Sequence, residues 1–194
     1  MKKTLLAVLM AATIGMTSMA ASAQMNDKPS MGHMKNPKVG GAEMSATKNI
    51  IENAVNSKDH TTLVAAVKAA GLVDTLSGPG PFTVFAPTNE AFAKLPAGTV
   101  DTLLKPENKD QLAKILTYHV VAGTVTAKEL VAKIKAGGGK AMLTTVSGGT
   151  LTATTKGGKV MLSDEKGGMA TVTIANVMQS NGIIHVVDSV LLPN

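Results

Sequence analysis

The sequence predicts an α+β domain, because helical patterns dominate its first half and strand patterns dominate its second half. Apolar residues recur at helical spacing from residue 50 onward, and segments rich in valine, threonine and isoleucine follow residue 140. Glycine pairs at 148–149, 157–158 and 167–168 separate these segments, as in the hairpin turns of an antiparallel sheet. Helices first and a strand meander afterwards favour an α+β fold over a parallel sheet with alternating helices.

Four helices are expected, each marked by a cap or stop residue beside an apolar stripe. In chain order, the signals are the cap residue Asn49, Gly71 after a helix over 62–70, Pro106 in a first turn, and the capping box of Thr126 and Glu129. Gly137–Gly139 are expected to end the last of these helices.

The first expected strand, residues 82–86, sends Phe82, Val84 and Ala86 to one face and Thr83 and Phe85 to the other. Because both faces carry a phenylalanine, we expect this strand to be covered on both sides. The remaining predicted strands are 141–146, 150–155, 159–162, 170–177 and 183–191, and the nearly unbroken apolar run of the last one places it centrally in its sheet.

The N-terminus has the order of a secretory signal peptide over residues 1–23. Lys2 and Lys3 precede the short apolar run Leu5–Met16, and the small residues Ala21–Ala23 form a cleavage site before Gln24. The sequence therefore predicts a secreted protein, in a periplasm or outside the cell. No later run is long and apolar enough for a transmembrane segment, and the absence of cysteine excludes disulfides and thiolate metal sites.

Composition divides the remaining chain into two parts. Residues 24–48 are polar, contain prolines and glycines, and have no apolar periodicity, so we expect a flexible leader. The apolar pattern begins at Asn49 and continues to Leu192, which predicts one domain over residues 49–194. From residue 49 onward, 13 lysines stand against 11 acidic residues, so the domain is nearly neutral.

The same composition argues against nucleic-acid binding and catalysis. The chain has no arginine and only four aromatic residues, which leaves neither a bidentate phosphate fork nor a stacking platform for bases. It also lacks the motifs of serine hydrolases, zinc proteases and phosphate loops. Asp164 and Glu165 are adjacent in an expected turn, where they cannot act as a facing acid–base pair. We therefore expect no enzyme and no cofactor.

The leader carries a cluster of soft ligands. Met31, His33 and Met34 lie within four residues, with Met25 and Met44 nearby, and thioethers with an imidazole suit copper(I). Copper(I) binding by this leader is one hypothesis, and an unselective tether is the alternative. Of the other histidines, His185 is expected to be a core residue and His60 a surface residue at a helix entry.

Three separated segments together resemble the fasciclin domain family. They are FTVFAPTNEAF at 82–92, the dipeptide Tyr118–His119, and NGIIHVVDSVLLP at 181–193, in the order found in that family. The resemblance covers Asn49 to Pro193. It implies a compact wedge of antiparallel sheet flanked by short helices, with no catalytic role, in proteins that are secreted or attached to cell surfaces.

The resemblance also implies a function in cell adhesion, biofilm or contact with an envelope or extracellular matrix, through a protein or polysaccharide partner. In animal members the segment around the tyrosine–histidine pair is implicated in integrin binding, so Tyr118 and His119 become the candidate partner-binding residues. The alternative for this pair is structural, since a tyrosine hydroxyl and an imidazole can bind buried backbone groups. A second alternative function is a carrier of an apolar small molecule, because some proteins of this fold carry carotenoids.

Overall fold

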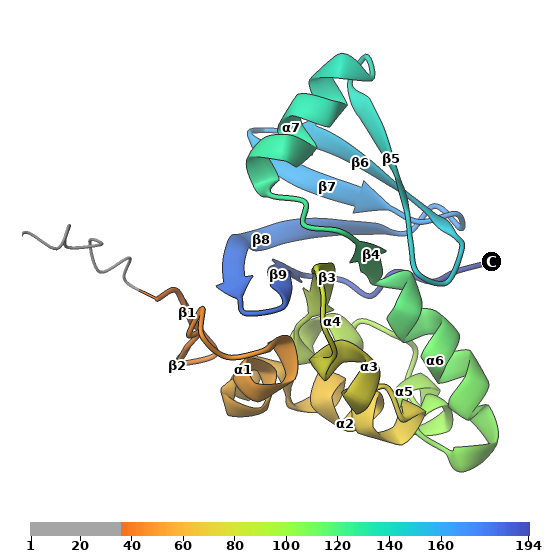
Figure 1. Ribbon diagram of the computed structural model, residues 1–194. Coiled ribbons are helices and arrows are strands. Elements are labelled where there is room, and N and C mark those ends of the chain that lie inside the picture. Colours follow the sequence, from red (N-terminus) through yellow and green to blue (C-terminus); the bar gives the residue numbers. More distant parts are fainter. Residues whose placement is uncertain (1–35) are drawn as a thin grey trace, which may run out of the picture. The chain divides into compact units, whose positions relative to one another are not determined.

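The computed structural model describes residues 36–194, which form a sheet with helices on two sides of it (Figure 1). The helices are α1 (Ile50–Asn56), α2 (Thr61–Ala70), α3 (Val73–Ser77), α4 (Asn89–Ala93), α5 (Thr99–Leu103), α6 (Lys109–Tyr118) and α7 (Ala127–Ala136), with short 3₁₀ turns η1 (Lys58–His60) and η2 (Pro106–Asn108). The strands are β1 (Lys38–Val39), β2 (Ala42–Glu43), β3 (Phe82–Pro87), β4 (Val120–Ala122), β5 (Lys140–Thr144), β6 (Thr150–Lys156), β7 (Lys159–Ser163), β8 (Met169–Gln179) and β9 (Gly182–Val187).

The main sheet is mixed, and this corrects the expected antiparallel wedge. Its strand order is β4-β3-β9-β8-β7-β6-β5, and the central pair β3 and β9 runs parallel while the other pairs are antiparallel. The two edge strands also approach each other, through a bridge between Val121 and Thr145 and a hydrogen bond from the Val146 amide to the Val120 carbonyl at 2.8 Å. The sheet is therefore nearly closed into a barrel.

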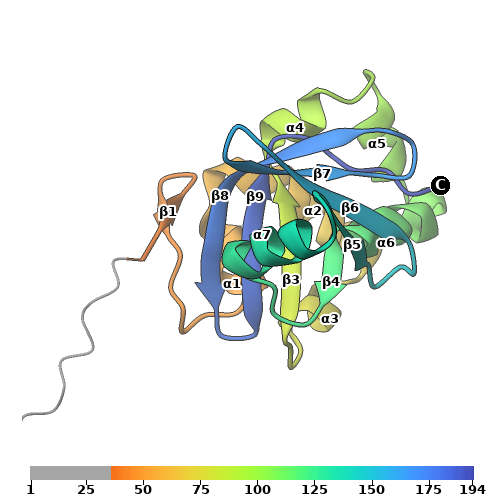
Figure 2. The same ribbon diagram turned by 90° about the horizontal axis from the view of Figure 1, so that it is seen from above.

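The long strand β8 connects the two halves of the sheet. Its first residues pair with β7 and its later residues with β9, with register shifts on either side of Ile174. Figure 2 shows β8, β9, β3 and β4 side by side, with β5–β7 running across them at a steep angle. Such irregularities increase local twist and bend a strand, which lets one strand serve both halves.

Two apolar cores lie on the two faces of β3, as its alternation predicts. Val84 and Ala86 pack with α1, α2 and α6 in one core, whereas Phe85 packs in the other core with α7 and the inner residues of β5–β8. The parallel neighbour β9 is buried along Ile183–Val187 and lies between β3 and β8. The central position predicted for this strand is confirmed.

The helix signals in the sequence act as expected. The side chains of Asn49 and Thr126 cap α1 and α7, each in a full capping box, with Glu52 and Glu129. Gly71 ends α2 in the left-handed region with φ of 70°, which a residue without a Cβ adopts readily. The helices α3, α4 and α5 have five residues each, so they are too short for apolar periodicity to reveal them.

The folded domain begins before residue 49, which corrects the expected boundary. The small strands β1 and β2 pair with each other, and Val39 and Met44 are 2% and 3% exposed in the core beneath α1 and α2. Gly40 and Gly41, both with positive φ, form the turn between β1 and β2. Because this hairpin has only one buried residue on each side of its turn, its sequence shows no apolar periodicity that could be recognised. The predicted signal peptide and residues 24–35 lie outside the described residues.

Candidate partner-binding site

Tyr118 is fully buried at the end of α6, where it joins two turns. Its hydroxyl donates to the Thr150 carbonyl at 2.8 Å and accepts from the Glu165 amide at 3.3 Å. The ring lies against the backbone of Gly149, where a Cβ would come within 2.5 Å of the ring edge. Burial raises the pKa of the Tyr118 hydroxyl, so this group remains a neutral donor near physiological pH.

His119 is 3% exposed and holds the chain segment that follows β9. Its Nδ1 lies 2.9 Å from the Ile115 carbonyl, and its Nε2 accepts from the Leu191 amide at 3.0 Å. These partners assign a neutral ring with the proton on Nδ1. Burial lowers the pKa of His119, against the opposing effects of the Ile115 carbonyl and the negative charge of Asp164.

The two side chains predicted to bind a partner are therefore buried. They can affect a partner only by positioning the residues at the surface near them. Glu165 accepts from the Thr150 amide at 2.9 Å, and Asp164 accepts from the Leu192 amide at 2.9 Å. The turn between β5 and β6 and the turn between β7 and β8 are thus fastened to α6 and to each other. We call their outer residues, Val146–Gly148 and Glu165–Gly167, the turn surface. Val146 is 47% exposed there.

The polar residues of the segment 82–92 also bind backbone groups. Thr88 accepts from the Ala91 amide and caps α4. Asn89 reaches to another element: its Oδ1 accepts from the Thr62 amide at 3.0 Å and its Nδ2 donates to the Lys58 carbonyl at 2.7 Å. This side chain therefore holds the start of α2 against the end of β3.

Asn181, which precedes β9, binds backbone groups of two further elements. Its Nδ2 donates to the Leu76 and Gly78 carbonyls at 2.8 and 3.0 Å, and its Oδ1 accepts from the Ile50 amide at 3.1 Å. The amide group thus connects α1 and the end of α3 to the sheet. These partners are distant in the chain, so the local sequence pattern around Asn181 does not show them.

His185 is a buried core residue, as predicted. Its Nε2 lies 2.9 Å from the Val125 carbonyl, and its ring stacks on Phe85 with centroids 5.6 Å apart. The carbonyl partner assigns a neutral ring with the proton on Nε2, which is the opposite tautomer to that of His119. Burial lowers the pKa of His185, and the hydrogen bond to Val125 opposes this only in part.

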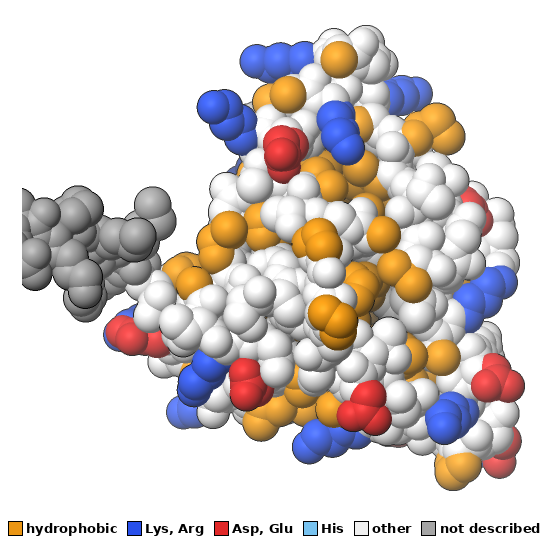
Figure 3. Space-filling view, in the orientation of Figure 1, with side chains coloured by type: hydrophobic (Ala, Val, Ile, Leu, Met, Phe, Trp, Pro, Cys, Tyr) orange, Lys and Arg blue, Asp and Glu red, His pale blue; other side chains and the backbone are white. Residues whose placement is uncertain are grey.

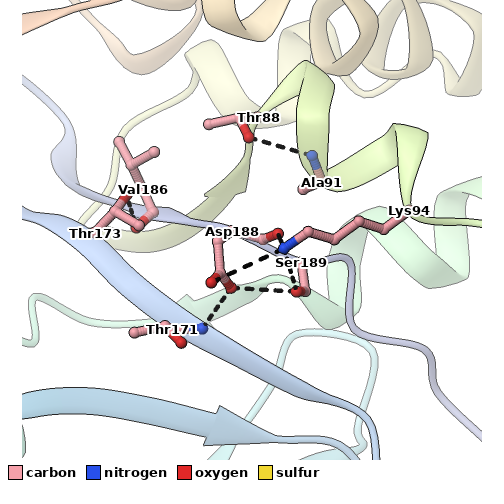
Figure 4. A network of polar contacts seen from close by, with 8 residues as sticks. All are labelled: Thr88, Ala91, Lys94, Thr171, Thr173, Val186, Asp188 and Ser189. Atoms are coloured by element: carbon pink, nitrogen blue, oxygen red, sulfur yellow. Dashed lines mark hydrogen bonds and ion pairs between the residues drawn. The ribbon is translucent and has the colours of Figure 1, made fainter.

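Asp188 fastens β8 and the loop after α4 to the end of β9 (Figure 4). Its Oδ1 accepts from the Thr171 amide at 2.8 Å, and Lys94 donates to the Asp188 backbone carbonyl at 2.6 Å. Partial burial raises the pKa of Asp188, but the Thr171 amide and the Lys94 charge together hold it below its ordinary value.

His60 was expected on the surface, and the structure corrects this. The ring is 3% exposed because η1 turns it beneath α2, where its Nδ1 lies 2.9 Å from Ser57 Oγ. Its Nε2 has no partner of good hydrogen-bond geometry within the described chain. Burial lowers the pKa of His60, while Asp59 and the Ala86 carbonyl oppose the shift.

The proposed copper ligands Met31, His33 and Met34 lie outside the described residues. Met44, which the sequence grouped with them, is part of the core of the domain. Within residues 36–194 no cluster of three or more histidine or carboxylate side chains could hold a metal ion.

Two apolar cavities lie beneath α1 and α2 and bear on the hypothesis of an apolar carrier. Their volumes are about 30 and about 20 Å³, and both are lined in part by Ile50, Ala54, Leu63 and Val84. Each has room for about one water-sized molecule. A larger apolar ligand would therefore require α1 and α2 to move away from β3.

A comparison with protein families matches the part of the chain that contains the three motif segments. The family model of the fasciclin domain matches residues 58–193. The chain belongs to the fasciclin domain family. The match contains all three segments, and β1, β2 and α1 extend this fasciclin domain on its N-terminal side.

Named relatives come from bacteria and from an animal. Protein sll1483 of Synechocystis sp. is 52% identical over 82% of this fasciclin protein and 81% of the relative. Immunogenic protein MPB70 of Mycobacterium bovis is 39% identical over 72% of this chain and 66% of its own length. Transforming growth factor-beta-induced protein ig-h3 of Sus scrofa is 37% identical over 68% of this chain, which corresponds to 17% of that protein.

A solved structure confirms the fold. The FAS1 domain pair from the insect cell adhesion molecule fasciclin I superposes with a TM-score of 0.66 at 22% identity. The superposition covers 75% of this chain and 51% of the pair. Among the described residues, moreover, no helix is long and apolar enough to cross a membrane.

Proposed function

We propose that this chain is a secreted, non-enzymatic fasciclin domain that mediates adhesion or contact with an envelope or matrix component. One observation carries the proposal. The polar side chains of the three recognised segments bind backbone groups of neighbouring elements: Asn89 and Asn181 hold helices, Tyr118 holds two turns, and His119 holds the segment after β9. Side chains that are used in this way are not available for chemistry on a substrate.

The partner-binding role that we infer for Tyr118 and His119 is indirect. Both side chains are buried, so the partner would contact the turn surface. Tyr118 binds both turns directly, and His119 binds Leu191, whose neighbour Leu192 donates to Asp164 of the second turn. Val146 offers exposed apolar area there, and Glu165 and Lys166 of the same turn surface are exposed and charged. A protein or polysaccharide on the cell surface is the class of partner that we propose, and the relative named as part of an insect cell adhesion molecule supports this class.

The experiment is a deletion with complementation in the producing organism, with attachment of cells to a surface as the measured quantity. Deletion should reduce attachment, and the wild-type protein should restore it. The variant Val146→Asp places a charge in the turn surface and should fail to restore attachment while keeping the melting temperature of the wild type. Val55→Asp is the matched control, because Val55 is 52% exposed on α1.

Two results would contradict the proposal in different ways. If deletion leaves attachment unchanged, adhesion is not the function of this protein. If deletion reduces attachment but Val146→Asp restores it as well as Val55→Asp does, the function stands and the turn surface is not the contact site.

A further inference from the structure

The charges of the described domain are unevenly distributed. Residues 127–160 carry six lysines and one acidic residue, whereas the rest of the described chain carries nine lysines and eleven acidic residues. The six lysines are Lys128, Lys133, Lys135, Lys140, Lys156 and Lys159. The domain is thus nearly neutral overall and has one strongly basic region.

The strand register brings the lysines of this region together. Lys156 and Lys159 are direct partners across the turn between β6 and β7, and Lys140 pairs with Thr154, two residues from Lys156. Lys133 from α7 and Lys140 line the same hollow. We call Lys133, Lys140, Lys156 and Lys159 the lysine tip. Figure 3 shows lysine side chains gathered over α7 and the start of β5, with one acidic side chain near them.

This arrangement costs stability within the fold. Like charges directly opposite each other on two strands are destabilising, and the glycines 157 and 158, with φ of 58° and 78°, hold Lys156 and Lys159 in that position. Both ion pairs found within the described residues, Lys94–Asp188 and Lys105–Glu107, lie outside the lysine tip.

Helix α7 explains only part of the cluster. Lys133 and Lys135 lie in its last turn, where cations are favourable beside the helix C-terminus. Glu129 lies in its first turn, where its carboxylate caps the helix through the Thr126 amide at 2.6 Å. The helix C-terminus does not explain the presence of Lys140, Lys156 and Lys159, because these residues lie on strands.

An exposed apolar side chain lies within the lysine tip. Met142 is 77% exposed and lines the hollow that Lys133 and Lys140 share. It points outward from β5, because the neighbouring Ala141 and Leu143 are buried. Basic residues around a protruding apolar side chain are typical of surfaces that bind the headgroup region of a membrane.

We propose that the lysine tip docks on the surface of an anionic lipid bilayer, with the lysines at the phosphate groups and Met142 at the boundary of the acyl chains. A soluble polyanion would use the charges but not Met142. The aromatic residues argue in the same direction: Phe85, Phe92 and Tyr118 are buried and Phe82 is half-buried, so no exposed ring is offered to stack on sugars or bases. This site lies at the opposite ends of β5 and β6 from the turn surface and does not depend on the proposed adhesion role.

The test measures binding of the protein, purified from its producing cells, to vesicles. Phosphatidylcholine vesicles are compared with vesicles that also contain about 30% phosphatidylglycerol. The anionic vesicles should bind the protein, the neutral ones should not, and binding should weaken strongly between about 25 and about 300 mM NaCl.

Two sets of variants locate the contact. The variant with Lys140→Gln, Lys156→Gln and Lys159→Gln should bind anionic vesicles about 100-fold more weakly, because each lysine near an anionic surface contributes about fivefold. The variant with Lys38→Gln, Lys58→Gln and Lys109→Gln has the same net charge and changes exposed lysines elsewhere, so it should bind nearly as well as the wild type. Met142→Ser should lower binding about threefold, and the control Met178→Ser, at a side chain 46% exposed, should not.

Several outcomes would overturn the proposal. They are absence of binding to anionic vesicles, equal binding to neutral and anionic vesicles, and equal losses in the two triple-lysine variants. Binding of dextran sulfate through the lysine tip without binding of vesicles would also overturn it, in favour of a soluble or polysaccharide polyanion.

Discussion

His119 accepts a hydrogen bond from the backbone amide of Leu191 at 3.0 Å, although 72 positions separate the two residues in the chain. The same ring contacts the Ile115 carbonyl through its other nitrogen. One neutral imidazole therefore connects the last turn of α6 to the segment that follows the central strand. This contact gives His119 a structural role in the fold.

Replacement of His119 by alanine should lower the free energy of unfolding by about 2–4 kcal/mol, because it leaves a buried amide without an acceptor and creates a cavity. His119→Gln should cost less, since its amide oxygen can still accept from Leu191. Urea unfolding of both variants measures the difference. Equal losses would show that the hydrogen bond to Leu191 contributes little.

The domain should lose stability as the pH falls below about 6.5. Burial lowers the pKa of His60, His119 and His185 in the folded state, so the unfolded chain takes up protons at a higher pH than the folded protein does. The stabilisation is complete above the unfolded pKa of about 6.5 and is lost progressively as the pH falls toward the folded values, by at most about 1.4 kcal/mol per histidine and pH unit.

Melting temperatures between pH 7.5 and 5 test this expectation. The variant His185→Gln keeps a donor for the Val125 carbonyl and removes one titrating ring, so its melting temperature should fall less steeply over this range. A wild-type melting temperature that stays constant from pH 7.5 to 5 would contradict the assignment of neutral rings.

Met44→Ala should destabilise the domain by about 2–5 kcal/mol, because this side chain is 3% exposed in the core beneath α1 and α2. Met142→Ala is the matched control at a side chain that is 77% exposed, and it should change stability by less than about 0.5 kcal/mol. Thermal unfolding compares the two. Similar values would place the domain boundary near residue 49 after all.

Gly149→Ala should destabilise the domain by about 1–3 kcal/mol, since the added Cβ would lie 2.5 Å from the edge of the buried Tyr118 ring. In a background with Tyr118→Leu the same substitution should cost less, because the shorter side chain leaves room for a methyl group. A double-mutant cycle in urea measures this coupling, and additive effects would argue against a direct clash.

Asn181→Asp should destabilise the domain more than Asn181→Ala does. The aspartate would remove the two donors to the Leu76 and Gly78 carbonyls and place a negative charge beside these oxygens. We expect a loss of about 2–4 kcal/mol for the aspartate variant. Chemical unfolding at pH 7 makes the comparison, and an aspartate variant as stable as the alanine variant would refute the electrostatic part of the argument.

Local sequence patterns were sufficient to predict the helices and strands whose signals lie within a few residues of one another. The cap at Asn49, the capping box at Thr126, the stop at Gly71 and the alternation of Phe82–Ala86 each depend on residues within a few positions, and the structure has them as expected. The hairpin Lys38–Glu43 and the three five-residue helices were missed because each is much shorter than the window of about 11–18 residues over which apolar periodicity can be recognised.

The candidate site was predicted less well, because burial is a tertiary property. The sequence selected Tyr118 and His119, but their hydrogen-bond partners at Thr150, Glu165 and Leu191 are 32 to 72 positions away. For the same reason His60 was expected at the surface. The lysine tip was also missed, since a count over the domain gives near neutrality and only the strand register brings Lys140, Lys156 and Lys159 together.

The sequence by itself therefore determined the family, the α+β class and the main helices and strands, because these depend on local periodicity, capping residues and family motifs. Only the tertiary structure decided that β3 and β9 run parallel, that the motif side chains are buried, and which exposed residues share a surface. Pairing between distant strands and contacts across the core leave no local pattern in the chain.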